Sequence, residues 1–168
     1  MKLFFFKDYN PFTLIPNIAL IKLKTKADDK YTPAKIPTPQ VERALASVGD
    51  TLRVSGWGSS ETGRFLPTLR SSTVPVISLQ ECHEKWVKEF NIEHEYDKAY
   101  YERFICTDES ASSSCVSDSG GPLIGSIGNT NFLFGIGAKT CDSVSLYTKY
   151  TRYNAWISHV TGLKPTDL

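Results

Sequence analysis

The stretch CVSDSGGPL, residues 115–123, combines residue types that could present a reactive hydroxyl. Two adjacent glycines and a proline follow an Asp-Ser pair, so the chain can turn tightly with few side chains around Ser119. A serine hydroxyl becomes an effective nucleophile when an imidazole accepts its proton and a carboxylate orients that imidazole. Ser119 is therefore a candidate nucleophile, and the alternative interpretation is a glycine turn with a purely structural role.

The histidines and cysteines narrow the chemistry further. His83 lies in a segment expected to be helical, His94 in a polar insertion and His159 near the end of the chain, and we expect each to be an ordinary surface or packing residue. The four cysteines form no C-x-x-C pair of the kind that zinc or redox motifs use. Two disulfides in an oxidising compartment are the better interpretation, with no metal ion and no cofactor.

Composition sets the scale and excludes some partners. A chain of 168 residues with 40% hydrophobic content can bury one complete domain plus a remnant of another. Its formal charge of +1 carries no block of like charges, which argues against nucleic acid and membrane partners. The apolar run at residues 3–6 is too short for a signal-peptide core or a membrane span and favours a strand. If the protein is exported, we expect the signal to be missing from this chain or the chain to begin inside a longer product.

The remaining pattern is rich in short strands. The segment NIALIKL at residues 17–23 predicts a buried strand, and residues 28–39 predict a surface connection that marks a domain boundary. Further strands are expected at TLRVSGWG, STVPVI, GPLIGSI, NFLFGIG and SVSLYTKY, the pattern of an all-β barrel or sandwich.

Two helices are expected among these strands. Ser78 followed by Glu81 resembles a capping box, which predicts a helix from about Leu79 toward Phe90. Apolar residues at helical spacing after Thr151 predict a terminal helix with one face on the barrel. The aromatic residues between Cys82 and Cys106 could form a binding surface, but a local minicore is the favoured interpretation; they are Trp86, Tyr96, Tyr100 and Tyr101.

Several segments together resemble one known family. SDSGGPL is similar to the G-D-S-G-G-P nucleophile motif of the chymotrypsin-like (trypsin) serine peptidases, and NIALIKL to their D-I-A-L-I-x-L segment. VSGWG and SLYTKYTRYNAWI also resemble family segments and follow in the family order. The resemblance implies antiparallel Greek-key barrels with a C-terminal helix. Residues 1–36 would be a remnant of the first barrel with the linker, and residues 37–168 the complete second barrel with its helix.

The resemblance also implies roles for the candidate catalytic residues. Ser119 matches the nucleophile, whereas Asn17 stands at the position of the carboxylate that orients the histidine. No histidine of the chain lies in an A-A-H-C-like segment. The backbone N–H groups of Ser117 and Ser119 would form the oxyanion hole, but the family has glycine where Ser117 stands, and a side chain there disfavours the required peptide orientation. Asp118 matches the acid that pairs with the new amino terminus in activated members, and it must find another donor or stay exposed.

The specificity pocket and the disulfides follow from the same resemblance. Ser113 would occupy the base of the pocket, where a neutral hydroxyl argues against selection of Lys or Arg, and Ser145 would stand in the pocket wall. The implied disulfides pair Cys82 with Cys106 and Cys115 with Cys141. A third family bridge is lost at both of its ends, Leu52 and Gly125.

The functional expectation is a trypsin-like serine endopeptidase homologue, secreted by ancestry, with impaired catalysis in this chain. Its partner would be a protein or peptide, as substrate or as binding partner. The alternatives are a pseudoprotease that acts as a binding or decoy module, and a truncated gene product without a role of its own. We also expect an unpaired edge at the start of the chain, with Phe4, Phe6, Phe12 and Ile18 supplying most of the exposed apolar surface.

Overall fold

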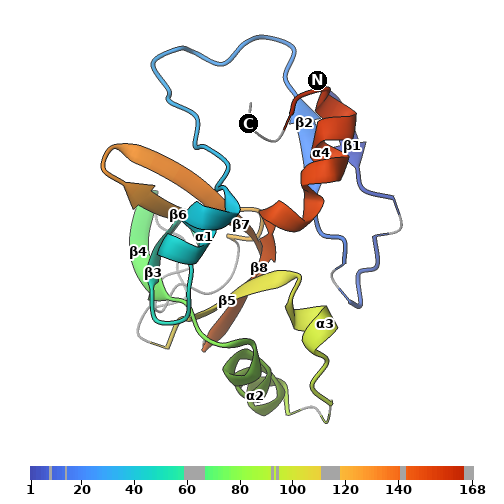
Figure 1. Ribbon diagram of the computed structural model, residues 1–168, viewed down its shortest axis with the longest axis vertical. Helices are drawn as coiled ribbons and strands as arrows, with labels where there is room; N and C mark the ends of the chain where they lie inside the picture. The colour runs from blue at the N-terminus through green and yellow to red at the C-terminus, as the bar shows by residue number, and fades with distance from the viewer. Residues whose placement is uncertain are drawn as a thin grey trace.

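The computed structural model describes residues 1–7, 9–13, 15–58, 67–91, 93, 95–110, 118–140 and 143–164. They form two antiparallel sheets with helices around them (Figure 1). The strands are β1 (Lys2–Phe5), β2 (Ala19–Lys22), β3 (Thr51–Gly56), β4 (Arg70–Pro75), β5 (Phe104–Asp108), β6 (Pro122–Ile127), β7 (Thr130–Thr140) and β8 (Val144–Lys149). The helices are α1 (Pro39–Leu45), α2 (Leu79–Phe90), α3 (Lys98–Tyr101), the 3₁₀ turn η1 (Tyr150–Tyr153) and α4 (Asn154–Thr161).

The larger sheet is a curled, six-stranded antiparallel sheet. Its strand order is β4-β3-β6-β7-β8-β5, and an isolated antiparallel bridge between Val76 and Thr107 brings the continuation of β4 beside β5. Strand β7 has a register shift against each of its neighbours, and bulges of this kind increase the local twist of a sheet. The all-β prediction with a C-terminal helix is confirmed, and the curled sheet is consistent with the chymotrypsin-like fold. All five strand segments expected after Thr51 are present.

The interior of this sheet is filled by large apolar side chains, among them Leu52, Leu123 and Phe134, each at most 2% exposed. A Cβ atom placed on Gly125 would lie 2.6 Å from Phe134 Cε2 and 3.0 Å from Leu52 Cδ2. The Phe134 and Leu52 side chains therefore together fill the space over Gly125. Leu52 and Gly125 are the residues that the family resemblance identified as the ends of a lost disulfide.

The smaller sheet pairs β1 with β2, with Leu3 opposite Ile21 and Phe4 opposite Leu20. The prediction of a buried strand at 17–23 is wrong in one respect, because β2 is a strand but Ile21 is 59% exposed. The physical reason is that β2 has a single strand partner, and the core formed with α4 includes Leu20 on the other face of the sheet. Figure 1 shows this sheet beside α4 and apart from the larger sheet.

Two residues expected to be exposed at the start of the chain are instead packed. Ile18 is buried in a cluster with Tyr150, Tyr153 and Ile157, and Phe6 packs against the same cluster. The Phe6 ring lies 5.6 Å from the Tyr153 ring in an edge-to-face arrangement. The expected exposure of Phe6 and Ile18 is therefore wrong, because η1 and α4 cover them.

Helix α1 lies in a region that the sequence pattern did not predict to be helical. The Thr38 side chain accepts a hydrogen bond from the Val41 N–H, and Pro39 begins the helix, both of which are typical of a helix start. Glu42 accepts a hydrogen bond from Thr151 Oγ1 at 3.0 Å and pairs with the Lys149 ammonium at 2.5 Å. Helix α1 is thus joined to the end of β8, and its apolar residues pack on the sheet interior.

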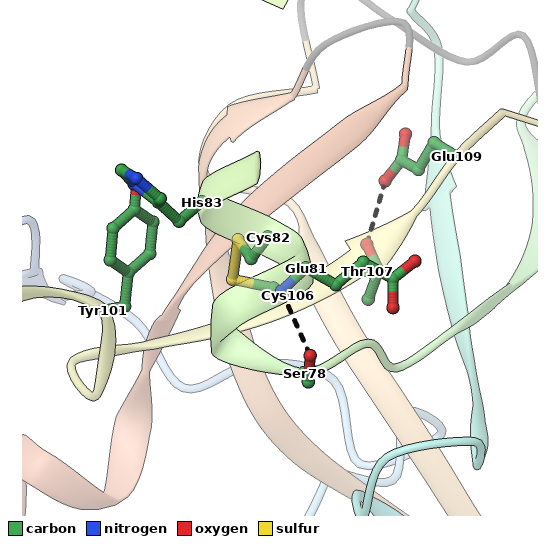
Figure 2. The surroundings of a disulfide bond; sticks show 8 residues. All are labelled: Ser78, Glu81, Cys82, His83, Tyr101, Cys106, Thr107 and Glu109. Atoms are coloured by element: carbon green, nitrogen blue, oxygen red, sulfur yellow. Dashed lines mark hydrogen bonds between the residues drawn. A yellow bond between two sulfur atoms is a disulfide. The ribbon is translucent and has the colours of Figure 1, made fainter. Parts of the chain in front are cut away.

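Helix α2 confirms its predicted start and its predicted disulfide. The Ser78 side chain accepts a hydrogen bond from the Glu81 N–H at 3.1 Å, and the helix ends at Phe90. Figure 2 shows Cys82 of α2 bonded to Cys106 of β5, with a Cα–Cα distance of 6.0 Å. This bridge fixes α2 on the outside of the curled sheet, where both cysteines are buried.

The aromatic residues around α2 and α3 form a local core, as favoured by the sequence. Tyr101 is buried, and Trp86, Tyr96 and Tyr100 pack against the same cluster. The Tyr100 ring lies 5.0 Å from the Tyr101 ring, edge to face. None of the described helices is long and apolar enough to cross a membrane.

Candidate functional site

The candidate nucleophile lies in a tight turn over residues 118–121. The Gly121 N–H donates to the Asp118 carbonyl at 2.8 Å, and Gly120 has a φ angle of +86°. Glycine adopts such a left-handed angle without steric cost, which explains why this position carries no side chain. Ser119 precedes it and is exposed, so the turn presents the hydroxyl to solvent.

Strand β7 holds the turn through backbone contacts alone. The Gly120 N–H donates to the Gly137 carbonyl, and the Gly137 N–H donates to the Gly121 carbonyl, both at 2.8 Å. A Cβ atom on Gly137 would lie 3.1 Å from the Asp118 carbonyl oxygen. The close approach of the two backbones therefore favours glycine at 137, and it fixes the position of Ser119.

Asp118 turns its carboxylate toward the segment after β3. The Gly58 N–H donates to Asp118 Oδ1 at 2.9 Å. A Cβ atom on Gly56 would lie 2.1 Å from the Asp118 carboxyl carbon, so the VSGWG segment needs its first glycine to admit this side chain. Among the described residues, the Asp118 carboxylate thus accepts a hydrogen bond from a backbone amide and takes part in no ion pair.

No described histidine is placed to activate Ser119. His83 is buried on α2, where its Nδ1 atom lies 3.3 Å from the Tyr101 hydroxyl (Figure 2). His159 is exposed on α4. The expectation that these two are packing and surface residues is confirmed, and His94 lies outside the described residues. Within the described part of the chain, the Ser119 hydroxyl has no hydrogen-bond partner.

Asn17 and Ser119 are held by different parts of the fold. Asn17 lies two residues before β2 and is half-buried next to Ile18, whose core contacts are with η1 and α4. Ser119 is anchored on β7 of the larger sheet. Among the described residues, no hydrogen bond or ion pair joins Asn17 to Asp118 or Ser119, and in a triad the acid contacts the imidazole and not the serine.

A buried carboxylate near the turn was missed by the sequence analysis. Glu109 directly follows β5, is only 2% exposed, and accepts hydrogen bonds from Tyr147 Oη at 2.9 Å and Thr107 Oγ1 at 3.4 Å. Burial raises the pKa of Glu109, the hydroxyl groups of Ser145, Tyr147 and Thr107 lower it, and the charge of Asp118 raises it again. The net direction is upward, because desolvation of the charged form is the largest effect.

One of the two predicted pocket residues, Ser145, lies near the polar groups around Glu109. Ser145 is buried on β8 two residues before Tyr147, and its hydroxyl has no hydrogen-bond partner among the described residues. The other predicted pocket residue, Ser113, lies outside the described residues, as do Ser117 and the cysteines Cys115 and Cys141. Their predicted roles in specificity, oxyanion binding and the second disulfide therefore stay predictions.

The described part of the site lacks a group that could activate the Ser119 hydroxyl for hydrolysis. It presents one rigid, exposed hydroxyl with no base beside it, and a serine hydroxyl alone is a weak nucleophile. Among the described residues, no group of three or more His, Cys, Asp and Glu side chains could hold a metal ion.

Comparisons with known proteins place these features in a family. The Trypsin family model matches residues 1–157. Complement C1s-1 subcomponent of Mus musculus is 36% identical over 160 residues, which cover 89% of this chain and 23% of that protein. Calcium-dependent serine proteinase of Mesocricetus auratus is 32% identical over 150 residues, covering 84% of this chain and 21% of that protein.

A shorter relative is similar over more of its own length. Trypsin 5G1 of Aedes aegypti is 27% identical over 165 residues, which cover 92% of this chain and 56% of that protein. The chain therefore spans less than a quarter of the first two relatives and a little over half of this one.

Proposed function

We propose that this chain, which belongs to the trypsin family of serine peptidases, is an endopeptidase homologue that does not hydrolyse peptide bonds and acts by binding a protein or peptide. The observation that carries the proposal is Asn17. In the family segment that NIALIKL resembles, this position carries the carboxylate that holds the catalytic imidazole and stabilises its charged form. The amide of Asn17 has no negative charge to give, and it favours the wrong imidazole tautomer.

The environment of Ser119 supports the same proposal. Its hydroxyl has no hydrogen-bond partner in the described part of the chain, although the turn that presents it is built with tight backbone contacts. At the predicted oxyanion hole, Ser117 replaces the family glycine, and loss of one such donor costs about two to four kcal/mol of transition-state stabilisation. A chain altered in this way retains the shape of the peptidase surface while losing the chemistry.

The organisation and the compartment are also proposals. We infer that residues 1–36 are a remnant of the first family barrel with the linker and residues 37–168 the second barrel. The separate β1–β2 sheet and the largely irregular backbone between β2 and α1 support this division. The Cys82–Cys106 disulfide supports export, because such bonds persist in oxidising compartments.

Hydrolysis of a quenched fluorescent casein tests the proposal. The chain and its Ser119→Ala variant should both give the buffer baseline, with trypsin as the positive control, because no charged triad assists the Ser119 hydroxyl. Turnover by the chain that disappears in Ser119→Ala would overturn the proposal. Turnover that survives in Ser119→Ala would come from a contaminating peptidase. Both proteins are then purified again by affinity until the Ser119→Ala variant gives the buffer baseline, and the activity of the parent chain is measured against it.

A further inference from the structure

A cavity of about 570 Å³ opens between the start of the chain, the α3 region and η1. None of its lining residues belongs to the 118–121 turn, so it is a different site from the one that presents Ser119. Its volume lies in the range of pockets that hold small molecules or a few peptide side chains. Nothing in the proposed peptidase ancestry assigns a role to it.

The floor of the cavity is apolar and fixed by packing. Phe6, Ile15, Pro16 and Tyr153 supply it. Phe6 is held by Tyr153 at 5.6 Å and by Trp156 at 5.2 Å between ring centroids. A floor built from packed rings is available to a ligand without rearrangement, which lowers the cost of binding.

The rim is cationic. Among the described residues that line the cavity, Lys7, Arg103 and Arg152 are cationic and Glu102 supplies one carboxylate, which leaves a surplus of two positive charges in this part of the lining. The whole chain has a formal charge of only +1, so positive charge is concentrated here. Such a concave, positively charged rim favours an anionic ligand.

Glu102 does not neutralise this rim. Its carboxylate lies 3.3 Å from Arg152 Nη2 and 3.8 Å from Lys98 Nζ, so two cations already share it. Within the described residues, the side chains of Arg103 and Lys7 make no ion pair. Arg103 is instead fixed through its backbone, whose carbonyl accepts from the Lys149 N–H at 2.9 Å. The charge of Arg103 also acts on the Tyr153 hydroxyl. Burial raises the pKa of this hydroxyl, and the positive charge of Arg103 lowers it.

We propose that this cavity binds an acidic peptide segment, with a carboxylate held by Arg103 and Arg152 and an aromatic or aliphatic side chain on the Phe6–Tyr153 floor. Guanidinium groups match carboxylates through paired N–H donors, which gives geometric selectivity as well as charge. An extended polyanion such as a sulfated polysaccharide fits less well, because it gains affinity from many cations along a surface and not from three around an apolar hollow. The proposal does not rest on the loss of hydrolysis, because the two sites share no residue.

Fluorescence polarisation with a fluorescein-labelled Glu-Glu-Tyr-Glu peptide tests the proposal. The full chain should bind it, and Arg103→Gln should weaken binding about tenfold, the effect of losing one charge-assisted contact. Arg43→Gln, at an exposed position of α1, is the matched control and should stay within about twofold because it removes the same charge elsewhere. Lys7→Gln provides a second rim variant at an exposed position, and circular dichroism checks that each variant is folded.

Changes in the probe separate the floor from the rim. Replacing its tyrosine with serine should also weaken binding, by about fivefold, because the floor then loses an apolar partner. Absence of binding up to about 1 mM peptide, an equal loss in Arg43→Gln and Arg103→Gln, or stronger binding of a heparin fragment through the same arginines would each overturn the proposal.

Discussion

At the scale of single residues, the site combines a well-built turn with altered chemistry. The backbone of Gly137 and the Gly58 N–H hold the residues around Ser119 through contacts that require no catalytic partner. Asn17 and Ser117 are the positions at which the family resemblance predicts a departure from the catalytic pattern. A buried acid, Glu109, lies close enough to this turn for the charge of Asp118 to affect its pKa.

Glu109 should make stability depend on pH. Burial raises the pKa of Glu109 above its ordinary value, so the folded chain holds this proton more tightly than the unfolded chain does. The resulting stabilisation is fully present below the unfolded-state pKa and is lost as pH rises through the folded-state pKa. Glu109→Gln keeps an acceptor for Tyr147 and should raise Tm by about 2–4 °C at alkaline pH while leaving it unchanged in acid.

Thermal unfolding followed by circular dichroism across this pH range measures the effect. Glu93→Gln, at an exposed position, is the matched control and should leave the pH profile unchanged. A Glu109→Gln variant that loses more stability in alkali than in acid would show that the folded protein needs the carboxylate charged.

Leu52 and Gly125 should accept the bridge that the family resemblance implies was lost. The pairing of Arg53 with Ile124 and Val54 with Leu123 extends to place Leu52 opposite Gly125 in the interior. We expect Leu52→Cys combined with Gly125→Cys to form a third disulfide with a shift of the Phe134 ring, which lies 2.6 Å from a Cβ atom placed on Gly125. Leu52→Ala alone should cost about 2–5 kcal/mol through the cavity that it leaves. Thiol counting without reductant and urea unfolding measure the two effects.

A one-residue shift supplies the control for this bridge. Ser126 points to the opposite face of β6, so Leu52→Cys combined with Ser126→Cys should keep two additional free thiols. Equal crosslinking of both pairs would contradict the register of β3 against β6.

At the scale of elements, one disulfide and one set of polar contacts hold helices α2 and α1 on the larger sheet. The disulfide holds α2 against β5, and the Glu42 contacts with Lys149 and Thr151 hold α1 against the end of β8. The second disulfide predicted from the resemblance, between Cys115 and Cys141, would join the segment before the Ser119 turn to the end of β7.

Disulfide mapping checks this arrangement. Non-reducing peptide mapping should return Cys82 with Cys106 and Cys115 with Cys141. Each closed loop has a size for which a disulfide contributes about 3 kcal/mol by restricting the unfolded chain. A Cys106–Cys115 crosslink would contradict the placement of Cys106 in β5 and the alignment of the family segments.

The helices and strands that could be predicted from the sequence are those with a local sequence signal. Ser78 with Glu81 indicated the start of α2, and short segments separated by Gly, Ser, Asn and Pro indicated the strands. Strand β5 was missed because it is short and buried on both faces, which removes the alternation that identifies a half-exposed strand. Helix α1 was missed because its Pro39 was taken as part of a connection, although Thr38 before Pro39 is also a helix-start signal.

The candidate site was predictable only where a motif spelled it out. Ser119 and Asp118 were found from DSGGP, whereas Glu109 has no local signature. Its burial depends on the pairing of β5 with β8, which brings Thr107 opposite Ser145 and close to Tyr147 although the two strands are far apart in the sequence. Contacts of this kind follow from the sheet and not from neighbouring residues.

At the scale of the whole molecule, the β1–β2 sheet leaves one apolar face uncovered by the described residues. Leu3, Phe5 and Ile21 are 44%, 71% and 59% exposed and share that face, while Leu20 on the other face packs with the α4 core. An exposed apolar sheet face favours association with another chain.

Self-association should therefore depend on this face. Leu3→Thr combined with Ile21→Thr preserves strand propensity while removing apolar surface, and it should shift the chain toward monomer in sedimentation velocity. Val48→Thr, at another exposed apolar position, is the control and should have no effect. Deleting residues 1–27 is a poorer test, because it would also remove Phe6 and Ile18 from α4. A monomeric parent chain at high concentration would contradict the prediction.

Covalent labelling of Ser119 by a fluorophosphonate probe tests the loss of catalysis most directly, because the probe reacts with a serine only when the site activates its hydroxyl. The 168-residue chain, its Ser119→Ala variant and mature trypsin are incubated with the probe and examined by intact mass. We predict that the chain gains no more label than Ser119→Ala in the time that trypsin is fully labelled. Stoichiometric labelling of the chain that Ser119→Ala abolishes would contradict the account.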